Sequence, residues 1–256
     1  MPIKLIENRI KVFFFEIQSF SALAVRAFLS MAYPPFYYRE FATQLDKIGV
    51  GSLFIIILTG LFTGMVMALQ ALIQLKPFAA SSYVGGMVAV SMIKELGPVL
   101  SALMVTGRVG SAITAEIGAM VVSEQVDAMR VEGTDIVKRL VTTRLQATLI
   151  ALPLLTIITD TVALAGGYIM AAGQGINPVM YWHSIPQFMV SQDLVEGVAK
   201  PVFFGFIIAM VGCHVGLHTT GGASGVGEST KRAVVLSSVL ILVADFFMAK
   251  IFIAFR

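Results

Sequence analysis

The chain has 256 residues, of which 57% are hydrophobic and only 13% are charged, and its formal net charge is +3. Soluble domains carry about 25% charged residues, so a chain with a mean hydropathy of +0.87 has too little polar surface to fold around one aqueous core. This composition excludes an ordinary soluble domain and predicts an all-α integral membrane protein. The single cysteine, Cys213, excludes an intrachain disulfide.

Residues 1–47 form an N-terminal segment that we expect to lie in the membrane interface. Within it, residues 3–31 are rich in Phe, Ile and Leu but are interrupted by Lys11, Glu16 and Arg26. This mixture is typical of a helix that lies at the bilayer surface, and the charges argue against a cleaved secretory signal. A sixth span over residues 3–31 is the alternative that the sequence leaves open.

Five apolar runs are long enough to cross the hydrocarbon core, which needs about 20 residues of helix. Residues rich in Gly and Pro at 166–178 end the third run and leave residues 181–192 as a segment outside the membrane or on its surface. The predicted transmembrane domain covers residues 48–256, with spans at about 48–75, 80–107, 145–172, 198–219 and 232–255.

Basic residues set the expected orientation, because Lys and Arg near span ends are retained in the cytoplasm. Thirteen of the 18 basic residues lie before residue 48, between Arg108 and Arg144, or at Lys231 and Arg232. With five spans, this pattern predicts a cytoplasmic N-terminus and a C-terminus on the opposite side.

The polar connection between the second and third predicted spans contains an amphipathic stretch at residues 121–130. Val122, Val126 and Met129 recur at helical spacing, and Glu124 and Asp127 fall on other faces. We expect a short cytoplasmic helix here. The alternative is an ordinary connecting loop.

Several runs in this order resemble the MlaE family of permeases, which are membrane subunits of ABC transporters that partner MCE proteins. The resemblance extends over nearly the whole chain. It rests on GLFTGMVMALQ at residues 60–70, KELGPVLSALMVTGRVGSAITAEIGAMVVSEQVDAMRVEGTD at residues 94–135, ALPLLT at residues 151–156, and a final span that contains Asp245.

The resemblance implies a homodimeric permease in the bacterial inner membrane, which moves phospholipid or a related lipid to or from a periplasmic MCE protein. It implies that a separate cytoplasmic ATPase binds ATP and Mg²⁺, that this chain holds no cofactor, and that a small cytoplasmic accessory subunit is a further partner to consider. The residues expected to couple the permease to the ATPase lie on or near the short cytoplasmic helix: Glu116, Glu124, Gln125, Asp127, Met129 and Arg130.

The first predicted span carries a stripe that suits a lipid-binding cavity. Its members follow one another at intervals of four, three, four and four residues, which places them on one helical face: Thr63, Met67, Gln70, Gln74 and Phe78. Met and Phe could contact acyl chains while the glutamines bond to a headgroup; the alternative is that both glutamines join helices. Leu75, Lys94 and Glu95 complete the candidate cavity.

Lys94 and Glu95 lie deep in the second predicted span, where charges are costly and usually face a partner or a polar cavity. By the resemblance, this pair lies near the lipid chamber and Lys94 could attract a phosphate. A structural ion pair with another span is the alternative. Further charges at membrane depth are Asp160, Lys200 and Asp245, whose pairing the sequence leaves unassigned. An ion-coupled transporter or channel would use such residues, and a noncatalytic scaffold is a third hypothesis.

Other motifs argue against enzymatic, metal and nucleic-acid sites. Residues 222–229 have the glycine spacing of a phosphate-binding loop but place Glu228 where that motif needs Lys. His214 and His218 are four residues apart without a convincing third ligand, so we expect no metal. The basic residues accompany membrane edges rather than a nucleic-acid-binding domain. Gly60 and Gly64 have the small-xxx-small spacing of close helix packing.

Overall fold

The computed structural model describes residues 2–254, apart from the side chains of residues 2–10, 12 and 13. Over this part of the chain the fold is helical and contains no strand, which confirms the predicted all-α class. Ten α-helices make up most of it: α1 Pro2–Met31, α2 Tyr38–Leu75, α3 Val84–Ser91, α4 Gly97–Val105, α5 Ser111–Val122, α6 Gln125–Val131, α7 Thr143–Gly173, α8 Pro178–Phe188, α9 Ser191–Leu217 and α10 Gly222–Ala254.

Five other turns connect these helices and do not interrupt the long axes of the spans. Two are 3₁₀ turns at the end of the bundle remote from α6, η1 (Lys76–Phe78) and η2 (Ser81–Tyr83). Three are π-helical turns, η3 (Met92–Leu96), η4 (Thr106–Gly110) and η5 (Val137–Thr142). Single π-helical turns inside α-helices are rare and occur often at functional sites.

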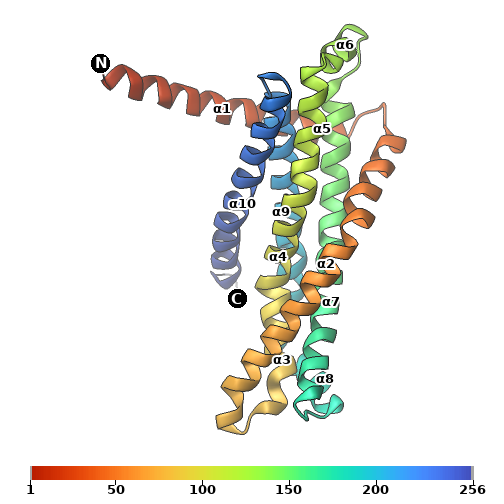
Figure 1. Cartoon of the computed structure of the whole chain (residues 1–256), viewed down its shortest axis with the longest axis vertical. Helices are drawn as coiled ribbons and strands as arrows, with labels where there is room; N and C mark the ends of the chain where they lie inside the picture. Colours follow the sequence, from red (N-terminus) through yellow and green to blue (C-terminus); the bar gives the residue numbers. More distant parts are fainter. Residues whose placement is uncertain (1, 255–256) are drawn as a thin grey trace.

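The described residues contain five stretches long and apolar enough to cross a membrane, the number that the sequence predicted: Tyr38–Phe78, Ser81–Val122, Val137–Gly173, Ser191–Leu217 and Gly222–Ala254. Figure 1 shows them side by side, with α6 at one end of the bundle and α8 at the other. The 42-residue stretch Ser81–Val122 is about 63 Å long at 1.5 Å per residue, twice the hydrocarbon thickness of about 30 Å. The helices therefore project well beyond the bilayer core.

Several boundaries differ from the predicted ones, mostly because a charged residue does not end a helix as it ends an apolar run. The second span continues to Val122 and not to residue 107, the third begins at Val137 and not at residue 145, and the fifth begins at Gly222 and not at residue 232. Helix α2 begins at Tyr38 and continues through residue 47, where the sequence placed the start of the transmembrane domain. Helix α9 begins at Ser191, not at residue 198. The short cytoplasmic helix begins at Gln125, not at residue 121, because Glu124 adopts a left-handed φ of 59° and separates α6 from α5.

Helix α1 lies across the α6 end of the bundle at a steep angle to the other long helices (Figure 1). It is not among the five described stretches that could span a membrane. Polar contacts hold it to the bundle, and one of them is a hydrogen bond from Thr142 Oγ1 to the Ala27 carbonyl at 3.4 Å. Ser30 Oγ lies 2.5 Å from Thr142 Oγ1 on η5, and Arg232 Nη2 of α10 lies 2.9 Å from Glu16 Oε1.

The packing of α2 against α7 depends on glycines that leave no room for a side chain. A Cβ atom at Gly64 would overlap the carbonyl oxygen of Ala163, and one at Gly60 would lie 2.8 Å from the carbonyl oxygen of Thr159. On α7, a Cβ at Gly166 would overlap the Leu61 carbonyl. The Gly60 and Gly64 spacing noted in the sequence is therefore a contact between two spans.

The end of the bundle remote from α6 is closed by α8 and by aromatic side chains. Asn177 caps α8 by accepting a hydrogen bond from the Val179 N–H at 2.9 Å. The buried Tyr181 donates its hydroxyl to the Leu164 carbonyl at 3.1 Å, and Tyr168 and Trp182 pack around it. Aromatic residues gather at membrane interfaces in this way.

Candidate functional site

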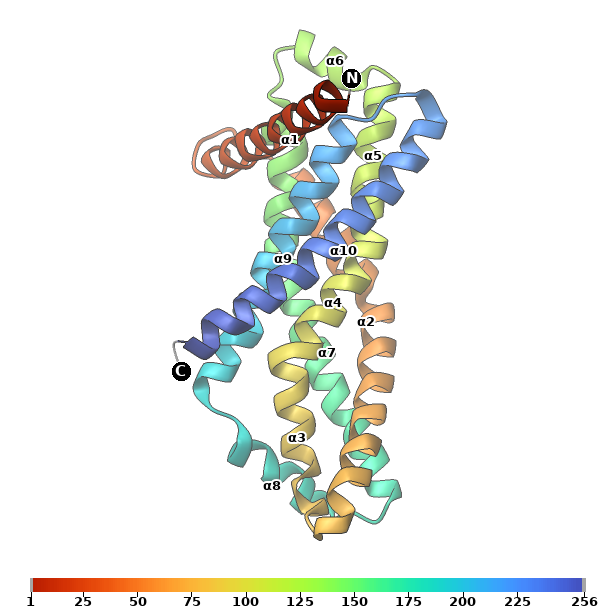
Figure 2. The same ribbon diagram turned by 90° about the vertical axis from the view of Figure 1, so that its left-hand side faces the viewer.

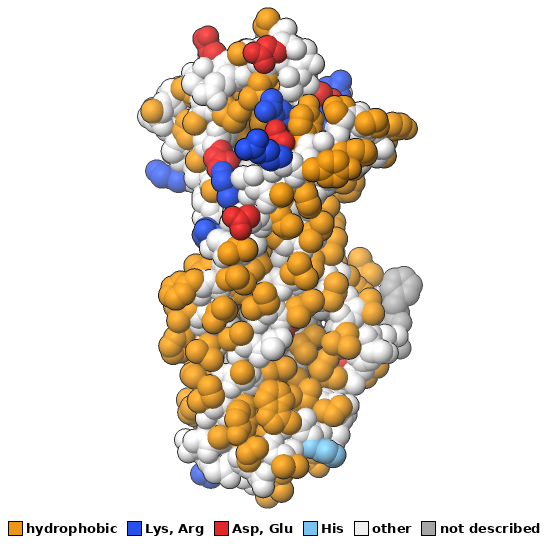
Figure 3. Space-filling model, turned by 90° about the vertical axis from the view of Figure 1, so that its right-hand side faces the viewer, with side chains coloured by type: hydrophobic (Ala, Val, Ile, Leu, Met, Phe, Trp, Pro, Cys, Tyr) orange, Lys and Arg blue, Asp and Glu red, His pale blue; other side chains and the backbone are white. Residues whose placement is uncertain are grey.

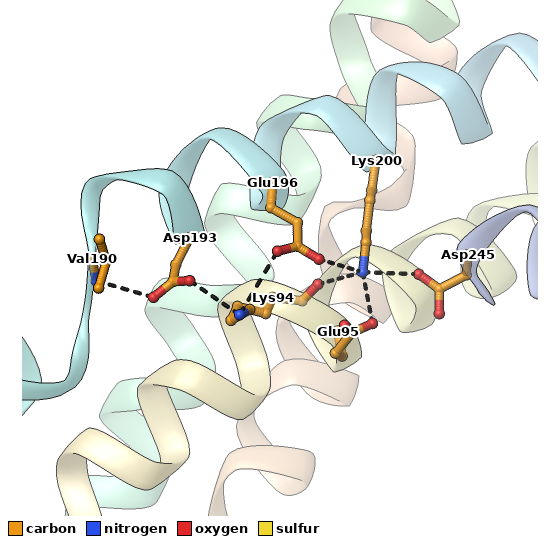
Figure 4. Close-up of polar contacts among 7 residues, drawn as sticks. All are labelled: Lys94, Glu95, Val190, Asp193, Glu196, Lys200 and Asp245. Carbon is orange, nitrogen blue, oxygen red and sulfur yellow. Dashed lines mark hydrogen bonds and ion pairs between the residues drawn. The ribbon is translucent and has the colours of Figure 1, made fainter. Parts of the chain in front are cut away.

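Six charged side chains meet at membrane depth between the second, fourth and fifth spans, and Figure 4 shows them together. We call this group the membrane charge cluster. Its members come from η3, α9 and α10: Lys94, Glu95, Asp193, Glu196, Lys200 and Asp245.

Lys200 is the centre of the membrane charge cluster and is completely buried. Its Nζ lies 2.6 Å from Glu95 Oε2 and 3.1 Å from Glu196 Oε1. It also lies 3.2 Å from Asp245 Oδ1 and donates to the backbone carbonyl of Lys94 at 2.9 Å. Three carboxylates from three spans thus share one ammonium group, which answers the pairing question that the sequence left open.

Lys94 forms the second half of the membrane charge cluster. Its Nζ lies 3.1 Å from Asp193 Oδ1 and 3.8 Å from Glu196 Oε2. Asp193 also accepts a hydrogen bond from the Val190 N–H at 3.0 Å, at the start of α9. Consecutive residues of an α-helix point about 100° apart. Here they lie in the π-helical turn η3, and both Lys94 and Glu95 reach charged groups of α9.

The membrane charge cluster has four carboxylates and two ammonium groups, so its formal charge is negative. A pocket of about 210 Å³ opens beside Lys94, Asp193 and Glu196. An excess of carboxylates repels a phosphate, and the Lys94 ammonium already has two carboxylate partners. These contacts favour the structural ion pair over the expectation that Lys94 attracts a lipid phosphate.

Asp160 is also a charged residue that the sequence placed at membrane depth, but it lies outside these ion pairs. Its side chain is buried on α7, and its Oδ1 has no hydrogen-bond partner within the part of the chain that the structure describes. Gly97, next to η3, makes room for it, because a Cβ there would overlap that carboxylate oxygen. Asp160 thus packs beneath the turn that carries Lys94 and Glu95.

The stripe predicted on the first span divides into a half-buried part and an exposed part. Thr63 and Met67 are half-buried on α2, as is Leu75, whereas Gln70, Gln74 and Phe78 are exposed. Phe78 is 80% exposed. Within the single chain, none of these residues lines a described pocket with Lys94 or Glu95. The stripe and the membrane charge cluster therefore form separate surfaces here.

The residues expected to contact the ATPase also divide into two groups. Glu124, Gln125, Asp127 and Arg130 are exposed at the α6 end, and Arg130 Nη1 binds Asp127 Oδ1 at 2.8 Å. Met129 faces inward and packs against Val126, Ile136 and Leu140. Val131 at the end of α6 is 90% exposed and lies one residue beyond the amphipathic stretch that the sequence predicted at residues 121–130.

Glu116 is half-buried between helices of the bundle and does not lie on the α6 surface. Its Oε1 lies 2.9 Å from Lys47 Nζ on α2, and its Oε2 lies 2.9 Å from Arg144 Nη2 on α7. Arg144 is only 5% exposed. Glu116 thus links three helices, a role that its place in the linear sequence did not reveal.

Two site residues were missed for one shared reason. Asp193 and Glu196 lie just before the apolar run of the fourth span and outside its predicted bounds of about 198–219. Their signal was present as a helical spacing: Asp193, Glu196 and Lys200 recur at intervals of three and four residues and share one face of a helix.

His214 and His218 lie close together at the α6 end of α9, with ring centroids 4.5 Å apart and ring planes tilted by 42°. No group of three or more His, Cys, Asp or Glu side chains able to hold a metal ion occurs among the residues described. Residues 222–229 form the first turns of α10.

Comparison with known proteins places this arrangement in a family. The family model described as Permease MlaE matches residues 41–251, which include the membrane charge cluster and all five spans except three residues at the start of the first and three at the end of the fifth. The chain belongs to the MlaE permease family. It is 40% identical over 237 residues to a probable ABC transporter permease protein of Rickettsia bellii, which covers 92% of each chain.

Two further relatives of this MlaE-family permease carry names that refer to lipids. One is the intermembrane phospholipid transport system permease protein MlaE of Haemophilus influenzae, 36% identical over 211 residues, which covers 81% of this chain and 80% of that protein. The other is protein TRIGALACTOSYLDIACYLGLYCEROL 1, chloroplastic, of Arabidopsis thaliana, 37% identical over 217 residues, which covers 84% of this chain and 62% of that protein.

Proposed function

We propose that this MlaE-family permease is the lipid-handling membrane subunit of an ABC transporter, which moves phospholipid or a related lipid out of or into the bacterial inner membrane. The observation that carries the proposal is the family match over residues 41–251, together with relatives named as an ABC transporter permease and a phospholipid transport permease. The five spans supply the membrane part that such a role requires.

The proposed orientation places α6, α1 and the start of α10 in or near the cytoplasm, and α8 in the periplasm. Figure 1 shows those three elements at one end of the bundle. The basic residues of that end include Lys47, Arg139, Arg144 and Arg232, and positively charged ends are retained in the cytoplasm. Figure 3 supports this assignment, since charged side chains gather over the α6 end and hydrophobic ones cover the face below it.

A separate ATPase is the proposed source of energy, with ATP and Mg²⁺ bound on that subunit and not on this chain. The described residues 2–254 are helical, whereas a phosphate-binding loop follows a strand. The exposed end of α6, with Glu124, Gln125, Asp127, Arg130 and Val131, is the proposed docking surface. An exposed apolar side chain surrounded by charged groups is typical of such a contact.

The proposed assembly is a homodimer that meets a periplasmic MCE protein at the α8 end, with the MCE partner inferred from the family resemblance. Helix α10 offers apolar surface that a second copy of the chain could cover within the membrane. Only 11% of the most apolar 18 residues of α10 are buried within this chain, against 61% for α9. Figure 2 shows α10 crossing one face of the bundle. A small cytoplasmic accessory subunit would bind at the α6 end.

The competing hypothesis is an ion-coupled transporter that uses the membrane charge cluster and Asp160. The cluster is the observation that favours this hypothesis, since carboxylates at membrane depth are typical of proton relays. In the ATP-driven proposal the same ion pairs have a structural role, which is to hold the second, fourth and fifth spans together.

Reconstitution separates the two hypotheses. The permease is co-expressed with its partner ATPase, purified as a complex, and placed in liposomes with a fluorescent phospholipid. We expect lipid transfer to an acceptor that depends on ATP and is lost when the ATPase is made unable to hydrolyse it. Transfer that instead requires a proton gradient and ignores ATP would refute the proposal, as would the failure of any ATPase to copurify.

A further inference from the structure

A second polar pocket lies nearer the α6 end than the membrane charge cluster does, between α2 and the second span. It encloses about 360 Å³. Its walls are residues 44–51 of α2 and residues 108–116 of η4 and α5. Asp46, Lys47, Arg108 and Glu116 supply charge, while residues such as Val50, Val109 and Ile113 supply apolar surface. A wall of this mixed kind suits an amphipathic ligand.

Arg108 is the cation of this pocket that lacks a described carboxylate partner. Its Nη1 donates to Ser52 Oγ at 2.9 Å and to the Lys47 carbonyl at 3.4 Å, and both acceptors are neutral. A guanidinium has five donors, so Nη2 and Nε retain three. The nearby carboxylate of Glu116 is occupied by Lys47 and Arg144.

The backbone of α2 is shaped to hold the Arg108 guanidinium. Gly51 faces it, and a Cβ atom at that position would lie 2.6 Å from Nη2 and 2.8 Å from Nη1. Arg108 itself lies in the π-helical turn η4. The Nη1–Nη2 end of the guanidinium therefore points at Gly51, and the edge formed by Nη2 and Nε can still donate, which is a geometry that binds a phosphate bidentately.

The pocket also lies at the depth of lipid headgroups. Arg108 is 27 residues from Ser81, the start of the second span, or about 40 Å along the helix at 1.5 Å per residue. The hydrocarbon core is about 30 Å thick, so in a bilayer whose opposite edge lies near Ser81, Arg108 is level with the headgroups near the α6 end. Below it, Phe54 and Phe62 of α2 are exposed, and Figure 3 shows a largely hydrophobic face.

The four charged side chains that line the pocket, Asp46, Lys47, Arg108 and Glu116, have no net charge. Arg144, which binds Glu116 but does not line the pocket, leaves one positive charge in excess around it. This sign is opposite to that of the membrane charge cluster. We infer that Arg108, held by Ser52 and Gly51, binds the phosphate of a phospholipid from the cytoplasmic leaflet, whose acyl chains then run along the exposed apolar face of α2.

This site deepens the proposed function, on which its assignment to the cytoplasmic leaflet rests. It gives a lipid transporter a place to hold a phospholipid at the level from which it would be extracted or into which it would be delivered. A free phosphate ion presents the same oxygens to Arg108. The apolar wall distinguishes the two, because a lipid would contact it and an ion would not.

A photo-crosslinking experiment tests the location of the lipid. The crosslinking amino acid benzoylphenylalanine is placed at Val50, which lines the pocket, or at Phe54, which is exposed one turn deeper. Membranes that contain the full complex and ³²P-labelled phospholipid are then irradiated. We expect Arg108→Gln to lower phospholipid capture at position 50 about tenfold, the loss expected for a charge-assisted contact. Capture at position 54 should fall less, because bulk bilayer lipid reaches that exposed position without Arg108.

A binding measurement distinguishes lipid from free anion. Native mass spectrometry of the purified complex compares dioctanoyl phosphatidylglycerol, dioctanoylglycerol and inorganic phosphate. We expect the phosphate-containing lipid to bind about tenfold more tightly than dioctanoylglycerol, and 10 mM inorganic phosphate to leave it bound. Displacement of the lipid by inorganic phosphate would assign the site to a free anion and overturn the inference. Equal binding of the two lipids would show that the site does not recognise the phosphate, and would also overturn the inference.

Three variants keep the test independent of folding. Gly51→Ala displaces the flexible guanidinium without removing it, so we expect weaker capture with an unchanged melting temperature. Arg108→Lys keeps the charge but loses the fork, and should retain part of the binding. Lys231→Gln, on an exposed residue of α10, is the matched control. Wild-type capture in both Arg108→Gln and Gly51→Ala would overturn the inference.

Failure of this site and failure of the proposed function have different signatures. If the wild-type complex transfers lipid with ATP but Arg108→Gln captures lipid normally, the site is refuted and the function stands. If no ATP-dependent transfer occurs while capture at position 50 still depends on Arg108, the phosphate site stands and the transport proposal is refuted.

Discussion

Lys200 Nζ lies 2.6 Å from Glu95 Oε2 and thereby joins α9 to the π-helical turn η3 of the second span. The Glu95 carboxylate is partly exposed, whereas Lys200 is completely buried. A buried ammonium in this position is stable only with its carboxylates, and those carboxylates repel one another without it.

Replacement of Lys200 by Met should therefore destabilise the bundle. Glu95, Glu196 and Asp245 would remain close together with no shared cation, at a cost of about 3 kcal/mol. That cost corresponds to a fall in melting temperature of roughly 6 to 12 °C for a domain of this size. Thermal unfolding in nanodiscs measures it, with Lys231→Met on the exposed part of α10 as control. A melting temperature equal to the wild type would show that the three carboxylates separate freely.

Gly64→Ala should disrupt the packing of α2 on α7. The added Cβ would overlap the Ala163 carbonyl, so the two helices must move apart and lose contacts along their length. We expect a loss of about 2 kcal/mol, seen as a lower melting temperature and less folded protein in the membrane.

Gly49→Ala is the matched control for this prediction, because it lies on the same helix and a Cβ there has nothing within 4 Å. Alanine favours a helix by about 1 kcal/mol over glycine, so this variant should be as stable as the wild type or slightly more so. An equal effect of both substitutions would attribute the loss to α2 alone and not to its contact with α7.

Val131→Asp should weaken ATPase binding without changing the stability of the permease. Val131 is 90% exposed, so a charge there has no buried contact to lose within this chain, but it would be costly inside an interface. Copurification of the ATPase with the tagged permease measures the effect, and we expect at least a fivefold loss. The control is Lys231→Glu, because Lys231 is exposed at the same end of the bundle but belongs to α10. Undiminished copurification of the Val131→Asp variant would place the ATPase contact elsewhere.

Glu116→Gln should lower the stability of the permease and leave ATPase binding nearly unchanged, which is the reverse of the effect expected for Val131→Asp. The substitution removes the charge that pairs with both Lys47 and the buried Arg144, and we expect a loss of about 1 kcal/mol because Glu116 is partly exposed. ATPase copurification should fall little once the protein is folded. If docking is lost while the melting temperature is unchanged, Glu116 contacts the ATPase directly, as the sequence analysis expected.

Much of the fold could be predicted because it depends on local composition. Each span needs a run of about 20 apolar residues, and such runs are visible from residue 48 onward without any knowledge of their neighbours. The charged and apolar residues of the segments that became α1 and α6 alternate at helical spacing, which is also a local property. Boundaries were less accurate where a helix continues past a charge, as at Lys47 and Asp193.

By itself, then, the sequence determined an all-α chain with five spans, a short helix between the second and third spans, and the family to which these motifs belong. Only the tertiary structure decided which distant groups meet: Lys200 with three carboxylates, Glu116 with Arg144, Gly64 with the backbone of α7, and Arg108 with Gly51. Hydrophobicity decides that a segment enters the membrane, whatever the rest of the chain does. Contacts between spans depend on the rotation, register and close approach of whole helices, which are set by packing throughout the bundle.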